Sequence, residues 1–180
     1  MTEPGPDRQR LFFALWPDES VRRRAGRIAR RWTPRRARRT PDEKLHITLA
    51  FVGDCDAERR ACLEAVADQV TGSPFELRLD RVGHFQRPRV LWLGTESPPE
   101  ALTAFHQALG RGLSEQCGVR RDRRPFHPHL TLGRKVARPR FAHLDDPLVW
   151  KVSEFCLVES VLTPGGAEYR VLRRWPLGHS

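Results

Sequence analysis

Apolar residues along the chain follow two patterns, continuous or alternating runs and stripes at helical spacing. Residues 11–16 form a continuous apolar run that ends at Pro17, which predicts a strand buried on both faces. Runs that alternate in polarity or are rich in β-branched residues predict further strands. These are expected near residues 45–53, 75–82, 89–94, 125–134, 150–162 and 168–175. Helical spacing of apolar residues predicts helices near residues 19–32, 54–70 and 100–117.

The order of these elements predicts the fold class. Helices do not alternate strictly with strands, so an α+β fold with largely antiparallel sheets fits better than a doubly wound parallel sheet. Residues 1–9 are polar, contain two prolines and are expected to form a flexible N-terminal tail. Residues 10–180 then form one domain, which agrees with the usual size of a single domain.

The chain is strongly basic, with 32 Lys and Arg against 22 Asp and Glu, a formal net charge of +10. This excess favours a polyanionic partner, with nucleic acid ahead of an anionic membrane surface. No apolar run approaches the ~20 residues that cross a bilayer. The first residues are charged and lack the apolar core of a secretory signal, so a cytoplasmic protein without membrane association is expected.

The four cysteines, Cys55, Cys62, Cys117 and Cys156, form no CxxC pair and no even framework. Such spacing is typical of buried or idle thiols in a reducing compartment. The sequence therefore predicts four free cysteines.

One short pattern occurs twice, as His46-Ile47-Thr48-Leu49 and as His129-Leu130-Thr131-Leu132. Both copies lie in predicted strands, where successive side chains point to opposite faces. Each copy therefore presents one imidazole and one hydroxyl on one face and two apolar side chains on the other. A single copy is a weak signal, but two copies with the same apolar alternation predict a shared functional role.

Two such strands facing one another suit a particular chemistry. Histidine titrates near pH 6.5, so one imidazole can accept a proton while the other donates one. Threonine hydroxyls beside them can donate hydrogen bonds to oxygens that gain charge in the transition state. Arg134, five residues after His129, can neutralise a phosphoryl oxygen. These groups predict in-line attack on a phosphodiester without a metal ion or another cofactor.

The paired motifs resemble those of the two-histidine (2H) phosphoesterase superfamily. Within it, the sequence is most similar to the RNA 2′,3′-cyclic phosphodiesterases, historically called 2′-5′ RNA ligases. The resemblance extends over nearly the whole chain, through segments 11–15, 45–53, 88–92, 126–134 and 159–162 and Tyr169. It implies a bilobal fold with a pseudo-two-fold repeat. In this fold, two antiparallel sheets, each backed by helices, surround a central cleft.

The resemblance also implies the reaction and its acid and base. A 2′,3′-cyclic phosphate end would be hydrolysed to a 2′-phosphomonoester, with 2′-5′ RNA ligation as the reverse reaction. His46 would be the proton donor to the departing 3′ oxygen, and His129 the proton acceptor that activates water. The expected partner is RNA with such an end or a small cyclic nucleotide, and the expected state is a monomer.

The resemblance implies four substrate-binding residues. Thr48, Thr131 and Arg134 would hold phosphoryl oxygens. Phe51 matches a position that stacks on the terminal base in the family. Phe51 lies five residues after His46, and in a regular strand an odd spacing places two side chains on opposite faces. A binding role for Phe51 therefore argues against a regular strand that continues from His46 to Phe51.

Two other functions are compatible with the same residues. A non-catalytic module could use this face only to hold an RNA end. A metal-dependent hydrolase could use the His127-x-His129 pair, although no third ligand of suitable spacing is evident. The basic segment 120–124 enters the strand of His129 and is a candidate contact for the RNA backbone.

Overall fold

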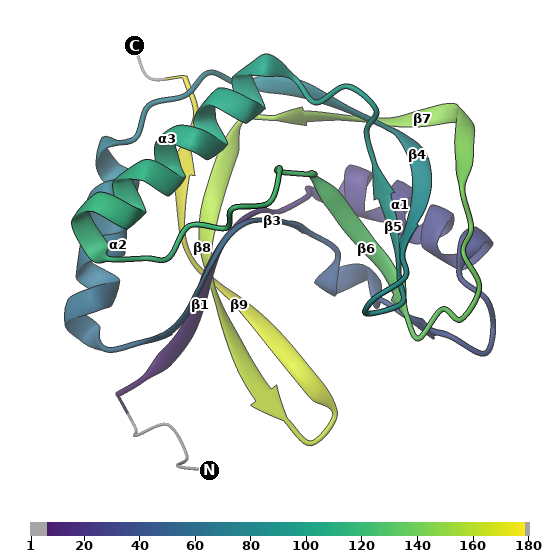
Figure 1. The fold of residues 1–180 in the computed structure, drawn as a ribbon, viewed down its shortest axis with the longest axis horizontal. Coiled ribbons are helices and arrows are strands. Elements are labelled where there is room, and N and C mark those ends of the chain that lie inside the picture. The colour runs from purple at the N-terminus through teal and green to yellow at the C-terminus, as the bar shows by residue number, and fades with distance from the viewer. Residues whose placement is uncertain (1–6, 179–180) are drawn as a thin grey trace.

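The computed structural model describes residues 7–178 as three helices and one antiparallel sheet (Figure 1). The helices are α1 (Glu19–Trp32), α2 (Ala57–Gln69) and α3 (Glu100–Cys117), with a 3-10 turn η1 (Asp42–Lys44). The strands are β1 (Gln9–Leu15), β2 (Arg38–Arg39), β3 (Ile47–Cys55), β4 (Phe75–Phe85), β5 (Val90–Gly94), β6 (His129–Arg134), β7 (Ala142–Val152), β8 (Glu154–Thr163) and β9 (Gly166–Pro176). The predicted α+β class is confirmed.

The strands form one nine-stranded sheet in the order β7-β4-β5-β6-β3-β1-β8-β9, with the short β2 also paired to β6. Between β3 and β6 the ladder contains one residue pair, Ile47 with Leu130. The two sheets that the resemblance implies are therefore two halves of one sheet, joined at this pair. We call β3, β1, β8 and β9 the His46 half, and β6, β5, β4, β7 and β2 the His129 half.

Helices α1 and α2 begin where the sequence provides a capping carboxylate, whereas α3 follows Pro99 without a side-chain cap. Asp18 accepts a hydrogen bond from the Val21 N–H at the start of α1, and Asp56 accepts one from the Arg59 N–H near the start of α2. Such caps satisfy N–H groups that have no partner within the helix. Helix α1 contacts β6 and β7 in the His129 half, whereas α2 and α3 contact each other and β3.

All three helices and both halves contribute to one main hydrophobic core. Strand β1 is buried on both faces, as predicted, because residues 11–15 are at most 4% exposed. Its Phe12 and Ala14 belong to a second, smaller apolar cluster with Cys156 and Val158, on the face away from the helices. Among residues 7–178, no helix is both long and apolar enough to cross a membrane.

The prediction of the last strands was incomplete. The segment expected as one strand, 150–162, contains the end of β7 and most of β8, separated at Ser153. Strand β7 begins at Ala142, well before the predicted start at residue 150. Its polar residues and Pro147 do not form the apolar pattern that predicts a strand. Proline is tolerated there because β7 is the edge strand of the sheet. Of the predicted tail, residues 1–6 lie outside the described residues, and Gln9 already belongs to β1.

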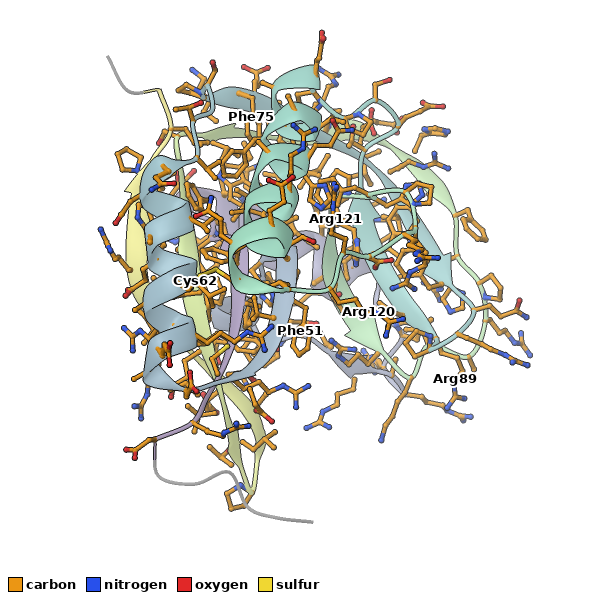
Figure 2. The ribbon with its side chains drawn as sticks, turned by 60° about the vertical axis from the view of Figure 1, so that its left-hand side comes forward. Phe51, Cys62, Phe75, Arg89, Arg120 and Arg121 are labelled. Carbon is orange, nitrogen blue, oxygen red and sulfur yellow. A yellow bond between two sulfur atoms is a disulfide. The ribbon has the colours of Figure 1, made fainter. Side chains whose placement is uncertain are left out.

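The prediction of four free cysteines was wrong for two of them. Cys62 of α2 and Cys117 of α3 form a disulfide with a Cα–Cα distance of 5.9 Å (Figure 2). These residues are 55 positions apart, and only the packing of α2 against α3 brings them together. Cys55 and Cys156 are free and buried, as expected.

Candidate active site

The two His-x-Thr motifs meet at the pair that joins the halves of the sheet. Ile47 and Leu130 are fully buried and point toward the helices. Because side chains alternate along a strand, the flanking histidines and threonines point to the opposite face, which we call the histidine face. The antiparallel register places the position before Ile47 beside the position after Leu130. Each histidine is thereby brought next to the threonine of the other motif.

Both imidazoles are oriented by the same contact. The Nδ1 of His46 lies 2.7 Å from the carbonyl oxygen of Lys44, and the Nδ1 of His129 lies 2.6 Å from that of His127. A carbonyl oxygen can only accept, so Nδ1 carries the proton in each ring. Nε2 is therefore the nitrogen that is free to exchange a proton with a substrate.

Burial and nearby positive charge favour the neutral form of both rings. Burial lowers the pKa of His46 to about 4, and the charges of Arg134 and His129 add to the shift. Burial also lowers the pKa of His129, with smaller contributions from His127 and Arg134. Arg134 therefore lies close enough to influence both rings. An anion bound beside it would offset this effect and favour protonation.

In the His46 half of the sheet, aromatic side chains pack against the ring of His46. Trp16 stacks on it with ring centroids 5.0 Å apart and an interplanar angle of 8°. Tyr169 of β9 contacts it edge-on at 5.1 Å, and Phe12 of β1 lies 5.2 Å away. These residues extend the small apolar cluster of the histidine face, so the imidazole is packed in place.

A similar aromatic support surrounds His129 on the other half. Phe85 contacts its ring edge-on at 5.2 Å, and Trp92 lies 6.4 Å away. Trp92 has room because glycines neighbour it: a Cβ on Gly83 would come within 2.2 Å of the indole, and one on Gly94 within 2.8 Å. The two glycines thus allow the indole to lie close to the sheet beside the catalytic candidate. These contacts with the imidazoles join residues of different strands, so no local sequence pattern predicts them.

A bulge in β3 places Phe51 on the histidine face. Thr48 pairs with Ala14, but Phe51 pairs with Phe12, so β3 carries an extra residue between them. Ala14 and Phe12 share a face, and Phe51 therefore shares it with Thr48. This bulge explains how Phe51 lies on the histidine face despite its odd spacing from His46. Phe51 is 54% exposed, and the guanidinium of Arg10 lies 5.1 Å from the centroid of its ring.

Arg134 is placed by an equivalent bulge in β6. Thr131 pairs with Trp92, and Gly133 pairs with Leu91, so β6 has an extra residue here. Gly133 faces the helix side, where a Cβ on it would come within 2.6 Å of Thr33. The next residue, Arg134, is therefore on the histidine face with Thr131. Phe51 and Arg134 each lie five residues after a motif histidine, so they are pseudo-equivalent positions of the two halves.

The structure also locates the other candidates. His127 is exposed, and its carbonyl rather than its ring contacts His129. Within residues 7–178, no three His, Cys, Asp or Glu side chains form a group that could hold a metal ion. The third ligand required by the metal hypothesis is therefore not found in that part of the chain.

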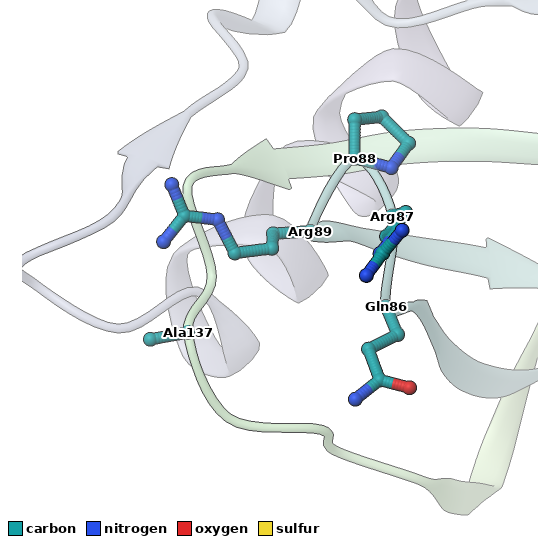
Figure 3. A pocket seen from close by; sticks show the side chains of 5 residues that line it. All are labelled: Gln86, Arg87, Pro88, Arg89 and Ala137. Atoms are coloured by element: carbon teal, nitrogen blue, oxygen red, sulfur yellow. The ribbon is translucent and has the colours of Figure 1, made fainter.

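Further basic side chains are exposed in segment 120–124 and at the β4–β5 turn. Segment 120–124 is exposed, and Arg124 of this segment pairs with Asp122. In Figure 2, Phe51, Arg120 and Arg89 follow one another across the lower half of the view. A hollow lies at the β4–β5 turn, lined by Gln86, Arg87, Pro88, Arg89 and Ala137 (Figure 3). Arg89 adjoins the end of β6 there, because its carbonyl accepts a hydrogen bond from the Val136 N–H.

The fold and the paired His-x-Thr strands define a two-histidine phosphoesterase. The chain belongs to the 2′-5′ RNA ligase superfamily, whose family model matches residues 17–163. The family resemblance inferred from the motifs is thus confirmed by a match over most of the chain.

Two named relatives align with nearly the whole chain. The RNA 2′,3′-cyclic phosphodiesterase of Escherichia coli (strain K12) is 35% identical, over 98% of this chain and 99% of its own. That of Archaeoglobus fulgidus is 34% identical, over 91% of this chain and 98% of its own. The crystal structure of E. coli LigT complexed with 3′-AMP matches with a TM-score of 0.87 at 32% identity, covering 96% of this chain and 99% of LigT. LigT has also been solved in complexes with ATP and NADP+.

Proposed function

We propose that this protein is an RNA 2′,3′-cyclic phosphodiesterase that opens the cyclic phosphate at the 3′ end of RNA and leaves a 2′-phosphomonoester. The observation that carries the proposal is the meeting of the two His-x-Thr motifs on one face, joined through the Ile47–Leu130 pair. The two relatives described above, which align over 98% and 91% of the chain, are named for this activity.

In the proposed reaction, the two histidines act on opposite sides of the phosphorus. His129 Nε2 accepts a proton from water, whose oxygen forms a bond to phosphorus while the P–O3′ bond breaks. His46 Nε2 gives its proton to the departing O3′, so the products are a 3′-hydroxyl and a 2′-phosphate. Proton exchange with solvent then restores both rings. The orientation of both Nδ1 atoms supports this step, because it leaves Nε2 free in each ring.

The protonation of His46 depends on the bound substrate in this account. In the free protein its pKa is lowered to about 4, so the neutral ring dominates at pH 7. The negative phosphate beside Arg134 offsets the charge that contributes to this lowering. The imidazolium that forms in the complex is a strong acid, which suits protonation of an alkoxide leaving group.

The remaining candidates hold the substrate in place. Thr48 and Thr131 donate hydroxyl hydrogen bonds to the non-bridging oxygens, and the Arg134 guanidinium balances their charge. The exposed ring of Phe51 stacks on the terminal base. These roles agree with the position of all four side chains on the histidine face. With a 5′-hydroxyl in place of water, the same groups would form a P–O5′ bond while the P–O3′ bond of the cyclic phosphate breaks, which gives a 2′-5′ linkage.

One chain supplies both histidines and all four binding residues, which supports action as a monomer. RNA is the proposed macromolecular substrate, in line with the net charge of +10. Because RNA fragments arise inside cells, we propose the cytoplasm as the place of action.

The proposal is tested by the products formed from an RNA oligonucleotide with a 2′,3′-cyclic phosphate. Mass spectrometry and digestion with a 3′-phosphate-specific phosphatase should show a phosphate that remains on O2′, at a rate unchanged by a chelator. A product carrying the phosphate on O3′ would contradict the assigned leaving group. Tight binding of RNA ends without any turnover would instead support the non-catalytic RNA-end-binding module.

A further inference from the structure

Arg38 lies beside Arg134 on the histidine face. The two residues are direct partners in the antiparallel pairing of β2 with β6. Side chains of such partners project to the same side of a sheet, with Cβ atoms about 5 Å apart. Moving along β6 away from His129, the chain therefore presents Thr131, then Arg134, and next to it Arg38.

Like charges directly opposite each other on neighbouring strands are destabilising. Arg38 is exposed, and among residues 7–178 neither it nor Arg134 forms an ion pair with a carboxylate. The adjacent Arg39 is different, because it faces the side of α1 and pairs with Asp42 at 3.2 Å. Two unpaired guanidinium groups placed side by side are most readily explained by anions that bind between or beside them.

Arg38 also reaches from one half of the sheet to the other. Its Nη2 lies 3.6 Å from the position that a Cβ on Gly166 would occupy. Gly166 begins β9 at the turn of the β8–β9 hairpin, which extends from the His46 half at the bottom of Figure 1. A strand of RNA that leaves the histidines between the halves would therefore pass this guanidinium. The hollow at Arg87 and Arg89 belongs to the His129 half alone (Figure 3).

We propose that Arg38 is a substrate-binding residue that holds the phosphodiester preceding the terminal nucleotide, so that the site prefers RNA strands to cyclic mononucleotides. This inference rests on the proposed function of the site. The cyclic phosphate carries one negative charge, which Arg134 matches. The positive charge of Arg38 is neutralised only when the substrate carries a second phosphate, which a cyclic mononucleotide lacks.

The test compares kcat/KM for a short RNA with a 2′,3′-cyclic phosphate against the cyclic mononucleotide of the same terminal base. Arg38→Ala and Arg38→Gln should lower the ratio of oligonucleotide to mononucleotide activity about ten-fold, as expected for the loss of one phosphate contact. Arg39→Ala removes the same formal charge one residue away and should leave the ratio unchanged. Equal losses on both substrates in the Arg38 variants would overturn the proposal. A larger effect from Arg89→Ala would also overturn it and direct the strand toward the hollow.

A binding measurement separates this inference from the proposed function. An RNA oligonucleotide with a 3′-phosphate, which has no cyclic bond to open, is titrated into each variant at several salt concentrations. Arg38→Ala should reduce the slope of log Kd against log salt by about 0.7, the value for one contact to single-stranded nucleic acid. An unchanged slope contradicts the role of Arg38 whether or not the protein turns over. Absence of turnover with a reduced slope contradicts only the proposed function.

Discussion

Ile47 pairs with Leu130 across β3 and β6, and this one pair joins the two halves of the sheet. Both side chains are fully buried, so their neighbours on either side face away from the core. The pair lies at the centre of the pseudo-two-fold repeat: His46 immediately precedes β3, Thr48 lies on β3, and the other motif lies on β6. The packing of two apolar side chains thus determines where two imidazoles meet.

The two halves differ five residues after each histidine, where one carries Phe51 and the other carries Arg134. Phe51→Ala should raise KM for RNA about ten-fold with little change in kcat, because base–aromatic stacking contributes ~1–3 kcal/mol. Phe51→Trp should retain most of the affinity. Phe141→Ala, at another exposed phenylalanine, is the matched control and should leave KM unchanged. Equal effects of the Phe51 and Phe141 changes would exclude a specific stacking role.

The packing of Trp92 against His129 depends on the absence of a side chain at Gly83. In Gly83→Ala the new methyl group would lie 2.2 Å from the Trp92 indole, which must move. We expect a loss of about 1–3 kcal/mol in the free energy of unfolding from this overpacking. Activity should fall as well, because Trp92 lies against His129.

Gly165→Ala is the control for this change, since Gly165 is exposed and a Cβ there would make only a 3.9 Å contact. Urea denaturation and kcat/KM of the two variants give the comparison. If Gly83→Ala were as stable and active as Gly165→Ala, the tight placement of Trp92 would have no functional importance.

The lowered pKa values predict how activity depends on pH. For kcat/KM, His129 must be neutral and His46 protonated, so the rate falls on the alkaline side as His46 loses its proton. Because the pKa of His46 is about 4 in the free protein, that limb lies well below pH 6.5. Substrate anion favours the protonated ring, so the corresponding limb of kcat should lie at higher pH.

Arg134→Gln provides the check on this explanation. It removes a positive charge that lowers the pKa of both histidines, so the kcat/KM profile of the residual activity should move to higher pH. Arg23→Gln changes an exposed arginine of α1 that pairs with Glu19 and should not move the profile. An Arg134→Gln profile that coincides with that of the native protein would contradict the electrostatic coupling.

The Cys62–Cys117 disulfide is expected to affect stability rather than catalysis. It closes a loop with a sequence separation of 55 residues, and the chain-entropy model gives about 4 kcal/mol for such a loop. Replacing both cysteines by alanine should lower the free energy of unfolding by that order and leave kcat/KM unchanged. A reductant should destabilise the native protein to the level of the variant and have no effect on the variant itself.

Much of the fold follows from local sequence patterns. Helices α1 and α3 begin and end where the helical spacing of apolar residues predicts them. Strands β2 and β7 gave little signal. Strand β2 is two residues long and is defined only by its pairing with β6, and β7 tolerates Pro147 at the edge of the sheet.

The candidate site was predictable to a similar extent. His46 and His129 could be found because alternation along a strand fixes which side chains share a face. Arg134 and Phe51 were also predicted, but their position on the histidine face depends on the bulges, which appear only in the pairing with neighbouring strands. The aromatic support of each imidazole and the disulfide between α2 and α3 depend on tertiary contacts that no local pattern encodes.

In the proposed mechanism the two histidines, one from each half, act together in one displacement. The most direct measurement is kcat/KM of His46→Ala, His129→Ala and the double variant on an RNA 2′,3′-cyclic phosphate. Each single change should lower the rate about a thousand-fold, within the range of general acid–base catalysis. The double variant should be little worse than the weaker single variant, because the two groups serve one step. A correctly folded single variant that keeps activity close to that of the native protein would contradict the account.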